Sequence, residues 1–188
     1  MTRPSTDQEL IQSFREGNER AFNDLVLRYQ EKVYWVARRF TDDHASADDI
    51  VQDVFIKAYE SLKDFRGDSS FYTWVYRITV NLSLNALRKR RVKEFFRLDD
   101  VLDLGESEDL EPHRIAESVE TKSMIAEAIG TLPEKQKAAF VLRYYEELSY
   151  DEMSKILKTS VGGLKANYFH ALKKIGEYLK RQGVEKSG

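Results

Sequence analysis

The 188-residue sequence contains no cysteine and only three prolines, and it has no apolar run of membrane-spanning length. The absence of cysteine excludes disulfides and thiolate metal sites. A transmembrane helix needs about 20 consecutive apolar residues, so the sequence offers no candidate for one. Residues 1–7 also lack the apolar core of a secretory signal peptide. These absences predict a cytoplasmic chain with no direct membrane insertion.

Catalytic and metal-binding motifs are equally scarce. The histidines His44, His113 and His170 lie in different segments, and no pair has metal-ligand spacing. No phosphate-binding loop and no serine-nucleophile motif is present. Carboxylates at 48–53 resemble a metal cluster, but no second acidic helix matches them, so a docking face is the better interpretation. We therefore expect no cofactor, no metal and no catalytic residue, although metal-dependent turnover would revive the hypothesis of an enzyme.

Charge is strongly segregated although the formal net charge is only −2. Residues 99–120 carry nine acidic side chains and one basic side chain. Such a strip has too little apolar surface to fold alone. The pattern predicts a first domain over 1–95, an acidic linker over 96–117 and a second domain over 118–185. The linker is either a passive tether or a nucleic-acid mimic that lies in a basic channel, and the sequence leaves both open.

Apolar residues recur at three-four spacing along both domains, and no segment shows sustained alternation, which predicts an all-α fold. Capping boxes at Thr6–Glu9 and Ser46–Asp49 predict helix starts in the first domain. A third box, at Thr131–Glu134, predicts a start in the second domain. The helices expected in the first domain cover about 6–16, 19–40, 46–62 and 70–91. Those expected in the second domain begin near 118, 131, 150 and 160.

Two helix starts in the last third, Ser149–Glu152 and Ser160–Gly163, flank a short apolar helix, with Lys158 and Thr159 as the turn. This pattern is typical of a helix-turn-helix, whose second helix enters the DNA major groove. The inner stripe of that second helix is predicted to be Val161, Leu164, Tyr168, Leu172, Ile175 and Leu179. The preceding helix is predicted to bury Ala138, Val141, Leu142 and Tyr145. The outward side is predicted to present Lys165, Ala166, Asn167, Phe169, His170 and Lys173.

The segment 64–91 mixes aromatic, amide and basic side chains along one expected helix. Its inner face is predicted to be Trp74, Val75, Ile78, Leu82 and Ala86. The remaining aromatic, amide and basic residues suit single-stranded bases, because rings stack, amides read base edges and cations hold phosphates. The alternative, that Phe71 and Trp74 are core and Arg88–Arg91 is a solvated helix end, stays open.

Three stretches resemble the extracytoplasmic-function (group IV) sigma factors of bacterial RNA polymerase, in the order and spacing of that family, over about 8–182. The stretches are ADDIVQDVFIKAYESL, FRGDSSFYTWVYRITVN and LPEKQKAAFVLRYYEELSYDEMSKIL. The resemblance implies two helical domains, sigma-2 and sigma-4, joined by a flexible linker. It implies a factor that binds core polymerase, reads the −35 duplex and captures melted −10 bases. An anti-sigma factor, frequently membrane-bound in this family, is expected as a further partner.

The resemblance also assigns residues to three sites. The docking segment for the coiled coil of the largest polymerase subunit matches Asp49, Gln52, Asp53 and Phe55. The −10 reader matches Asp64, Phe65, Arg66, Ser69, Phe71, Tyr72, Asn81, Asn85 and Arg88. Trp74 matches this reader as well, but we expect it in the core. The −35 reader matches Arg143, Ser160, Gly163, Lys165, Ala166, Asn167, Phe169 and His170.

Departures from the family concentrate on the −35 side. Lys158 stands where glycine is frequent in the turn. Ala166 and Asn167 stand where serine and arginine are common, and His170 replaces a common arginine. These departures leave the −35 surface less cationic than usual. A stand-alone helix-turn-helix regulator is the alternative, and it predicts tight binding of the isolated protein to a palindrome.

Overall fold

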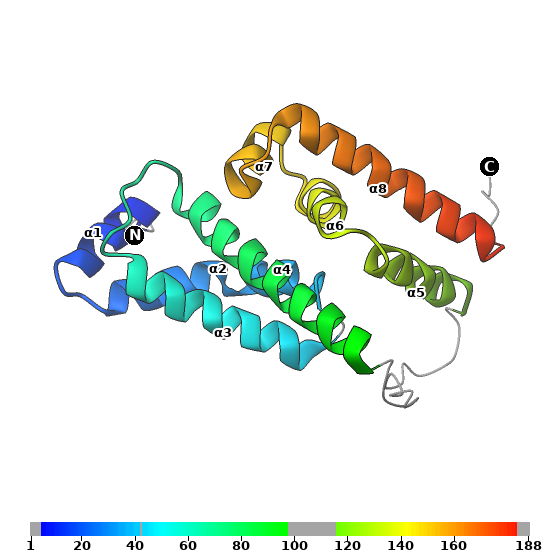
Figure 1. The fold of residues 1–188 in the computed structure, drawn as a ribbon. Helices are drawn as coiled ribbons and strands as arrows, with labels where there is room; N and C mark the ends of the chain where they lie inside the picture. Colours follow the sequence, from blue (N-terminus) through cyan, green and yellow to red (C-terminus); the bar gives the residue numbers. More distant parts are fainter. Residues whose placement is uncertain (1–4, 42, 98–115, 184–188) are drawn as a thin grey trace. The chain divides into compact units, whose positions relative to one another are not determined.

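A computed structural model describes residues 5–41, 43–97 and 116–183 of the chain (Figure 1). These residues form helices joined by short loops, and no strand occurs among them. The all-α fold class is therefore confirmed. Most of the acidic linker predicted over 96–117 lies outside the described residues. No helix in the described ranges is long and apolar enough to cross a membrane.

The chain divides into two compact units, the first made mainly of residues 1–89 and the second mainly of 90–153 and 159–188. The helices of the first unit are α1 (Asp7–Arg15), α2 (Arg20–Arg38), α3 (His44–Ser61) and most of α4 (Phe71–Arg97). The capping box at α1 is confirmed, because the Thr6 hydroxyl accepts from the Glu9 amide at 3.3 Å and the Thr6 amide donates to the Glu9 carboxylate at 2.7 Å.

Helix α3 begins earlier than the box predicted at Ser46–Asp49, and that prediction is wrong. Asp43 is the N-cap, and its carboxylate accepts from both the amide and the hydroxyl of Ser46, each at 2.7 Å. The bond from the Ser46 amide is the main cause of the lowered pKa of Asp43. A charged carboxylate at the N-cap outcompetes the serine three residues downstream, because it also interacts favourably with the helix dipole.

The buried face of α4 differs from the predicted one. Phe71, Val75, Tyr76, Val80 and Leu87 are the buried apolar residues of this helix. Four of the five residues predicted inside are instead half-buried and flank this face; they are Trp74, Ile78, Leu82 and Ala86. The predicted buried face is wrong because it is rotated about the helix axis relative to the observed one. The cause is that the aromatic residues at the start of α4 pack inward.

The second unit contains α5 (Ala116–Gly130), α6 (Glu134–Phe140), a π-helical turn η1 (Val141–Tyr145), the first half of α7 (Tyr150–Leu157) and α8 (Val161–Arg181). The helix start predicted at Ser149 is confirmed and takes the form of a capping box with Glu152, and Ser160 caps α8 by accepting from the Gly163 amide at 3.2 Å. The box predicted at Thr131 is wrong. The Thr131 hydroxyl donates to the Ala128 carbonyl at 2.7 Å, and α6 has no side-chain cap.

The core of the second unit is centred on α5, α6 and α8. One cluster of buried residues there consists of Ala128, Ile129, Leu132, Phe140, Ala171 and Ile175. Leu164 is buried as predicted, but Leu172 is 44% exposed and Ala171 takes its place in the core. Tyr145, predicted inside, is 37% exposed. The π-helical turn changes the register after Phe140, so spacing counted through an ordinary α-helix misplaces Tyr145.

Candidate nucleic-acid interface

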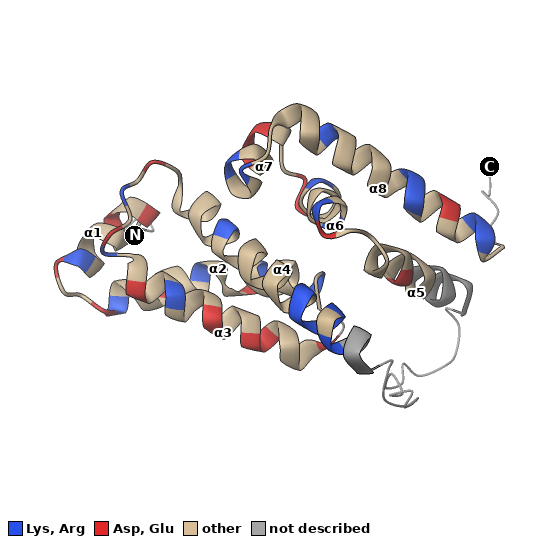
Figure 2. Cartoon of the chain, in the orientation of Figure 1, with Lys and Arg blue, Asp and Glu red and all other residues tan. Residues whose placement is uncertain are grey.

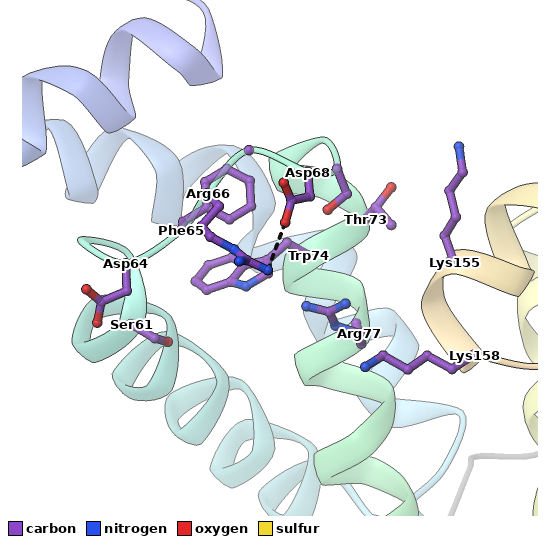
Figure 3. A pocket seen from close by; sticks show the side chains of 12 residues that line it. Ser61, Asp64, Phe65, Arg66, Asp68, Thr73, Trp74, Arg77, Lys155 and Lys158 are labelled. Atoms are coloured by element: carbon purple, nitrogen blue, oxygen red, sulfur yellow. Dashed lines mark ion pairs between the residues drawn. The ribbon is translucent and has the colours of Figure 1, made fainter.

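The loop between α3 and α4 surrounds a hollow on the surface of the first unit (Figure 3). Four residues predicted for the −10 site lie in this loop and line the hollow. They are Asp64, Phe65, Arg66 and Ser69. Trp74 and Arg77 of α4 line it as well. The hollow is therefore bounded by two aromatic rings, two guanidinium groups and short polar side chains.

Local contacts give the loop its shape. Gly67 adopts a φ of +76°, which side-chain-bearing residues rarely do, and lets the chain reverse direction. Arg66 and Asp68, on either side of Gly67, form an ion pair at 3.2 Å (Figure 3). Both side chains are largely exposed, so the pair adds little stability but limits where the guanidinium points. The Ser70 hydroxyl accepts from the Thr73 amide at 3.1 Å and so caps α4.

A stripe of aromatic, amide and basic side chains starts half-buried at this hollow and continues, exposed, along α4. At about 100° per residue, its members fall within one narrow sector of the helix. We call these residues the α4 stripe: Trp74, Arg77, Asn81, Asn85 and Arg88. The side chains of Asn81, Asn85 and Arg88 are exposed, and Arg88 donates to the Asn85 amide oxygen at 3.1 Å. Basic residues gather towards the C-terminal end of α4 (Figure 2).

Two aromatic residues predicted for the −10 site lie elsewhere. Phe71 is only 2% exposed and packs against Tyr29, with ring centroids 5.2 Å apart. Phe71 therefore belongs to the core, and the aromatic ring that it was expected to present is supplied by Trp74. Tyr72 lies on the side of α4 that faces α2, with the Lys32 ammonium 6.0 Å from its ring centroid. Because nine residues separate Tyr72 from Asn81, they occupy opposite sides of the helix.

A second surface, on α3, combines carboxylates with an apolar residue. Asp49, Gln52 and Asp53 are exposed, as predicted for a docking face. Phe55 is only 8% exposed and packs inside, so its predicted place in this face is wrong. Ile56 is 51% exposed and lies three and four residues after Asp53 and Gln52, on the same side of the helix. We call Asp49, Gln52, Asp53 and Ile56 the α3 face.

The helix-turn-helix of α7 and α8 has the expected local structure. Lys158 in the turn adopts the left-handed conformation, with φ +49°, at a position where glycine would be unstrained. Small residues follow the Ser160 cap, and Gly163 is so close to the cap that an added Cβ would lie 3.2 Å from the Ser160 hydroxyl. The first turn of α8 therefore presents backbone amides together with the positive end of the helix dipole, which suits a phosphate.

Past this first turn, α8 presents the side chains predicted to contact DNA. Lys165, Ala166 and His170 are exposed, Asn167 is half-buried, and Phe169 is 63% exposed. The Lys165 ammonium lies 5.7 Å from the ring centroid of Tyr150 in α7.

Arg143 lies in η1, and it supports the α8 surface without being part of that surface. The Arg143 guanidinium donates to the Leu148 carbonyl at 2.8 Å and lies 5.2 Å from the Tyr150 ring centroid. Tyr150 thus has a cation on its ring from each of two elements. Arg143 and Lys165 are held beside one aromatic ring, which fixes the start of α8 relative to the element before it.

Two family models match the chain, Sigma-70 region 2 over 25–92 and Sigma-70 region 4 over 122–175. The RNA polymerase sigma-H factor of Pseudomonas aeruginosa is 38% identical over 184 residues, which are 92% of this chain and 93% of the relative. The ECF RNA polymerase sigma-E factor of Escherichia coli K12 is 37% identical over 187 residues, which are 93% of this chain and 95% of the relative.

Solved structures agree with this match. CnrH, solved in complex with the cytosolic domain of CnrY, has a TM-score of 0.68 at 26% identity, with 93% of this chain and 97% of that chain covered. The sigma factor RpoE of Bartonella quintana, solved with the anti-sigma factor NepR, has a TM-score of 0.65 at 21% identity. It covers 85% of this chain and 96% of its own, and it shares the fold.

Two helical units with a region 2 match and a region 4 match define the chain as a bacterial sigma factor, a class of non-enzymatic transcription initiation factors. It belongs to the extracytoplasmic-function sigma factors of the sigma-70 family. The chain is thus an alternative sigma factor that binds RNA polymerase and promoter DNA and directs promoter-specific transcription. In the described residues no group of three histidine, aspartate or glutamate side chains is placed to hold a metal ion.

Proposed function

We propose that this sigma factor holds its promoter at two points, with the α4 stripe on the melted −10 strand and α8 on the −35 duplex. One observation carries the proposal: the α4 stripe begins at the loop hollow with the half-buried Trp74 and Arg77 and continues along α4 with exposed amide and basic side chains. Cations, amides and an aromatic ring in one line can follow a single strand, because each recognises a different part of a nucleotide.

Base capture at the hollow supplies the driving force for melting. A base that leaves the duplex enters the hollow, and Phe65 and Trp74 offer it ring surfaces while Arg66 and Arg77 hold the flanking phosphates. Stacking on an aromatic side chain stabilises an unpaired base by about 1–3 kcal/mol. That amount is comparable with the cost of unstacking one base. Capture therefore shifts the equilibrium towards the open duplex, and the proposal requires no nucleotide hydrolysis by this chain and no catalytic residue.

The −35 contact is of a different kind. Lys165 donates to a guanine edge or a phosphate, and Ala166 and Phe169 offer apolar contact to a thymine methyl. The Gly163 amide is bonded to the Ser160 hydroxyl, and the other amides of the first turn of α8 approach a phosphate. Arg143 acts through Tyr150 by keeping α8 in place. This surface has few cations, so we expect −35 binding to be weak until polymerase and the −10 contacts contribute.

The α3 face provides the attachment to polymerase. Its carboxylates suit a basic partner and Ile56 supplies the apolar centre that protein interfaces require. We propose that it docks on the coiled coil of the largest polymerase subunit, and that the chain acts in the cytoplasm with the polymerase. Relatives are solved with the cytosolic domain of CnrY and with the anti-sigma factor NepR. We infer that an anti-sigma factor holds this chain inactive as well, by covering the surfaces that bind polymerase.

Two substitutions, each made in holoenzyme and tested on one responsive promoter, separate the proposed −10 role from the proposed −35 role. Asn81→Ala should leave closed-complex affinity near wild type and reduce permanganate-reactive thymines at −10. Lys165→Ala should weaken closed-complex binding, with a shallower dependence on salt because one phosphate contact is lost. Lys180→Ala is the matched control, because Lys180 is exposed in the last turn of α8, at the other end of the helix from the proposed contacts. Equal effects of the two substitutions on melting would contradict the proposal.

A further inference from the structure

The loop that shapes the hollow is fastened by a residue outside the −10 site. Arg15, in the last turn of α1, donates a guanidinium hydrogen to the backbone carbonyl of Phe65. Fifty residues separate the two partners, and both belong to the first unit. A cation at the C-terminal end of α1 is also favoured by the helix dipole, so the side chain has a second reason to stay near this end.

The other bonds of the loop are local. The Asp64 amide donates to the Ser61 carbonyl and the Phe65 amide donates to the Leu62 carbonyl, each at 3.2 Å. These bonds add one turn after the end of α3 and set the shape of that turn. They do not tie the loop to another helix, so they leave the distance from the loop to α4 unspecified.

Phe65 connects the loop to two helices at once. Its ring packs on Trp74 of α4, with centroids 5.1 Å apart, and its carbonyl is held by Arg15 of α1. The ring contact alone permits sliding, because aromatic pairs accept a range of offsets. The directional bond from Arg15 limits that sliding. Together the two contacts set the position of the Phe65 ring relative to the Trp74 ring. They thereby set the ring surfaces that an incoming base meets.

We propose that Arg15 is a positioning residue for base capture: it holds the Phe65 carbonyl and thereby keeps the hollow open in the shape that receives a flipped base. The inference rests on the proposed −10 role of the α4 stripe. Its physical effect is pre-organisation, since a loop already in place loses less conformational entropy when the base binds. Arg15 itself touches no base.

The experiment uses the full chain with Arg15→Gln, Arg15→Lys and Arg20→Gln. Arg20, an exposed arginine on α2, is the matched control for loss of charge. Amide hydrogen exchange at Asp64 and Phe65 is measured on the free protein, and the fraction of −10 thymines reactive to permanganate is measured in holoenzyme. We expect Arg15→Gln to speed exchange and to lower the opening equilibrium about tenfold, the size of one lost charged hydrogen bond.

The conservative variant separates positioning from general stability. Arg15→Lys keeps a cationic donor and should restore most of the opening, whereas Arg20→Gln should match wild type in both measurements. Unchanged exchange in Arg15→Gln, or faster exchange with unchanged opening, overturns the inference. Wild-type holoenzyme that fails to open any promoter overturns the proposed function instead, and exchange at Asp64 and Phe65 still decides whether Arg15 holds the loop.

Discussion

The contrast between Phe71 and Trp74 gives the sharpest test of the −10 site. The two residues are three positions apart, and their ring centroids are 5.6 Å apart. Phe71 is buried against α2, whereas Trp74 lines the hollow at the head of the α4 stripe. Alanine at Phe71 should therefore damage the fold, and alanine at Trp74 should damage promoter opening.

The expected magnitudes follow from burial. Phe71→Ala removes a ring that is 2% exposed, which costs about 3–5 kcal/mol of unfolding free energy. Trp74 is half-buried, so Trp74→Ala should cost less, on the order of 2 kcal/mol. Its loss should also remove one stacking surface for an unpaired base, worth about 1–3 kcal/mol, and so lower the opening equilibrium about 5- to 150-fold.

The assay pairs urea unfolding with permanganate footprinting of holoenzyme. The chain has two tryptophans, Trp35 and Trp74, and both lie in the first unit, so fluorescence reports on that unit. Trp35→Ala is the matched control, because Trp35 is 49% exposed on α2 and packs edge-on against Tyr34. We expect that control to change neither stability nor opening by more than a small amount.

Two results would refute the reasoning. If Phe71→Ala were as stable as wild type, the ring would not be part of the core. If Trp74→Ala and Trp35→Ala reduced opening equally, the tryptophan at the hollow would have no specific role. Opening is compared at temperatures where each variant is folded, so that lost stability is not mistaken for lost capture.

Four further outcomes are expected. Lys158→Gly should raise the unfolding free energy by about 0.5–1 kcal/mol in urea, because it relieves the left-handed backbone; lower stability would contradict the strain argument. Ile56→Asp should weaken binding to core polymerase about tenfold or more in a fluorescence titration, and an unchanged Kd would remove Ile56 from the α3 face. In Lys165→Ala, the slope of log affinity against log salt on a −35 duplex should fall by about 1, and an unaltered slope means no phosphate contact. Asp43→Ala should cost about 1 kcal/mol at neutral pH. Because folding lowers the pKa of Asp43, its contribution is present above the unfolded value and is lost as pH falls through the folded value; a constant difference between the two proteins down to low pH would argue against this.

Local signals in the sequence predicted much of the fold. The box at Thr6 and the helix starts at Ser149 and Ser160 all form as expected, because each depends only on residues three apart. The failures at Ser46 and Thr131 have local causes as well. In the first, an upstream aspartate offers a better acceptor; in the second, the hydroxyl bonds back to the preceding helix. Spacing alone does not rank competing caps.

The site was predicted less well than the helices, because exposure depends on which side of a helix packs. The resemblance placed Phe55 and Phe71 in contact surfaces, and packing buries both. Ile56, the exposed neighbour of Phe55, was missed, and Trp74, which matched the −10 reader, was wrongly expected in the core. A signal for Trp74 does exist in the sequence: positions 74, 77, 81, 85 and 88 keep three-four spacing and so share a face. No comparable signal marks Arg15, since its contact with the loop is set by tertiary packing.

The measurement that tests the central claim most directly is run-off transcription by core polymerase on a library of promoters, with and without this chain. The account predicts new initiation at a small set of promoters that share a −35 and a −10 element, and loss of that initiation when either element is scrambled. No added initiation at any promoter would contradict it, as would initiation that survives loss of the −10 element.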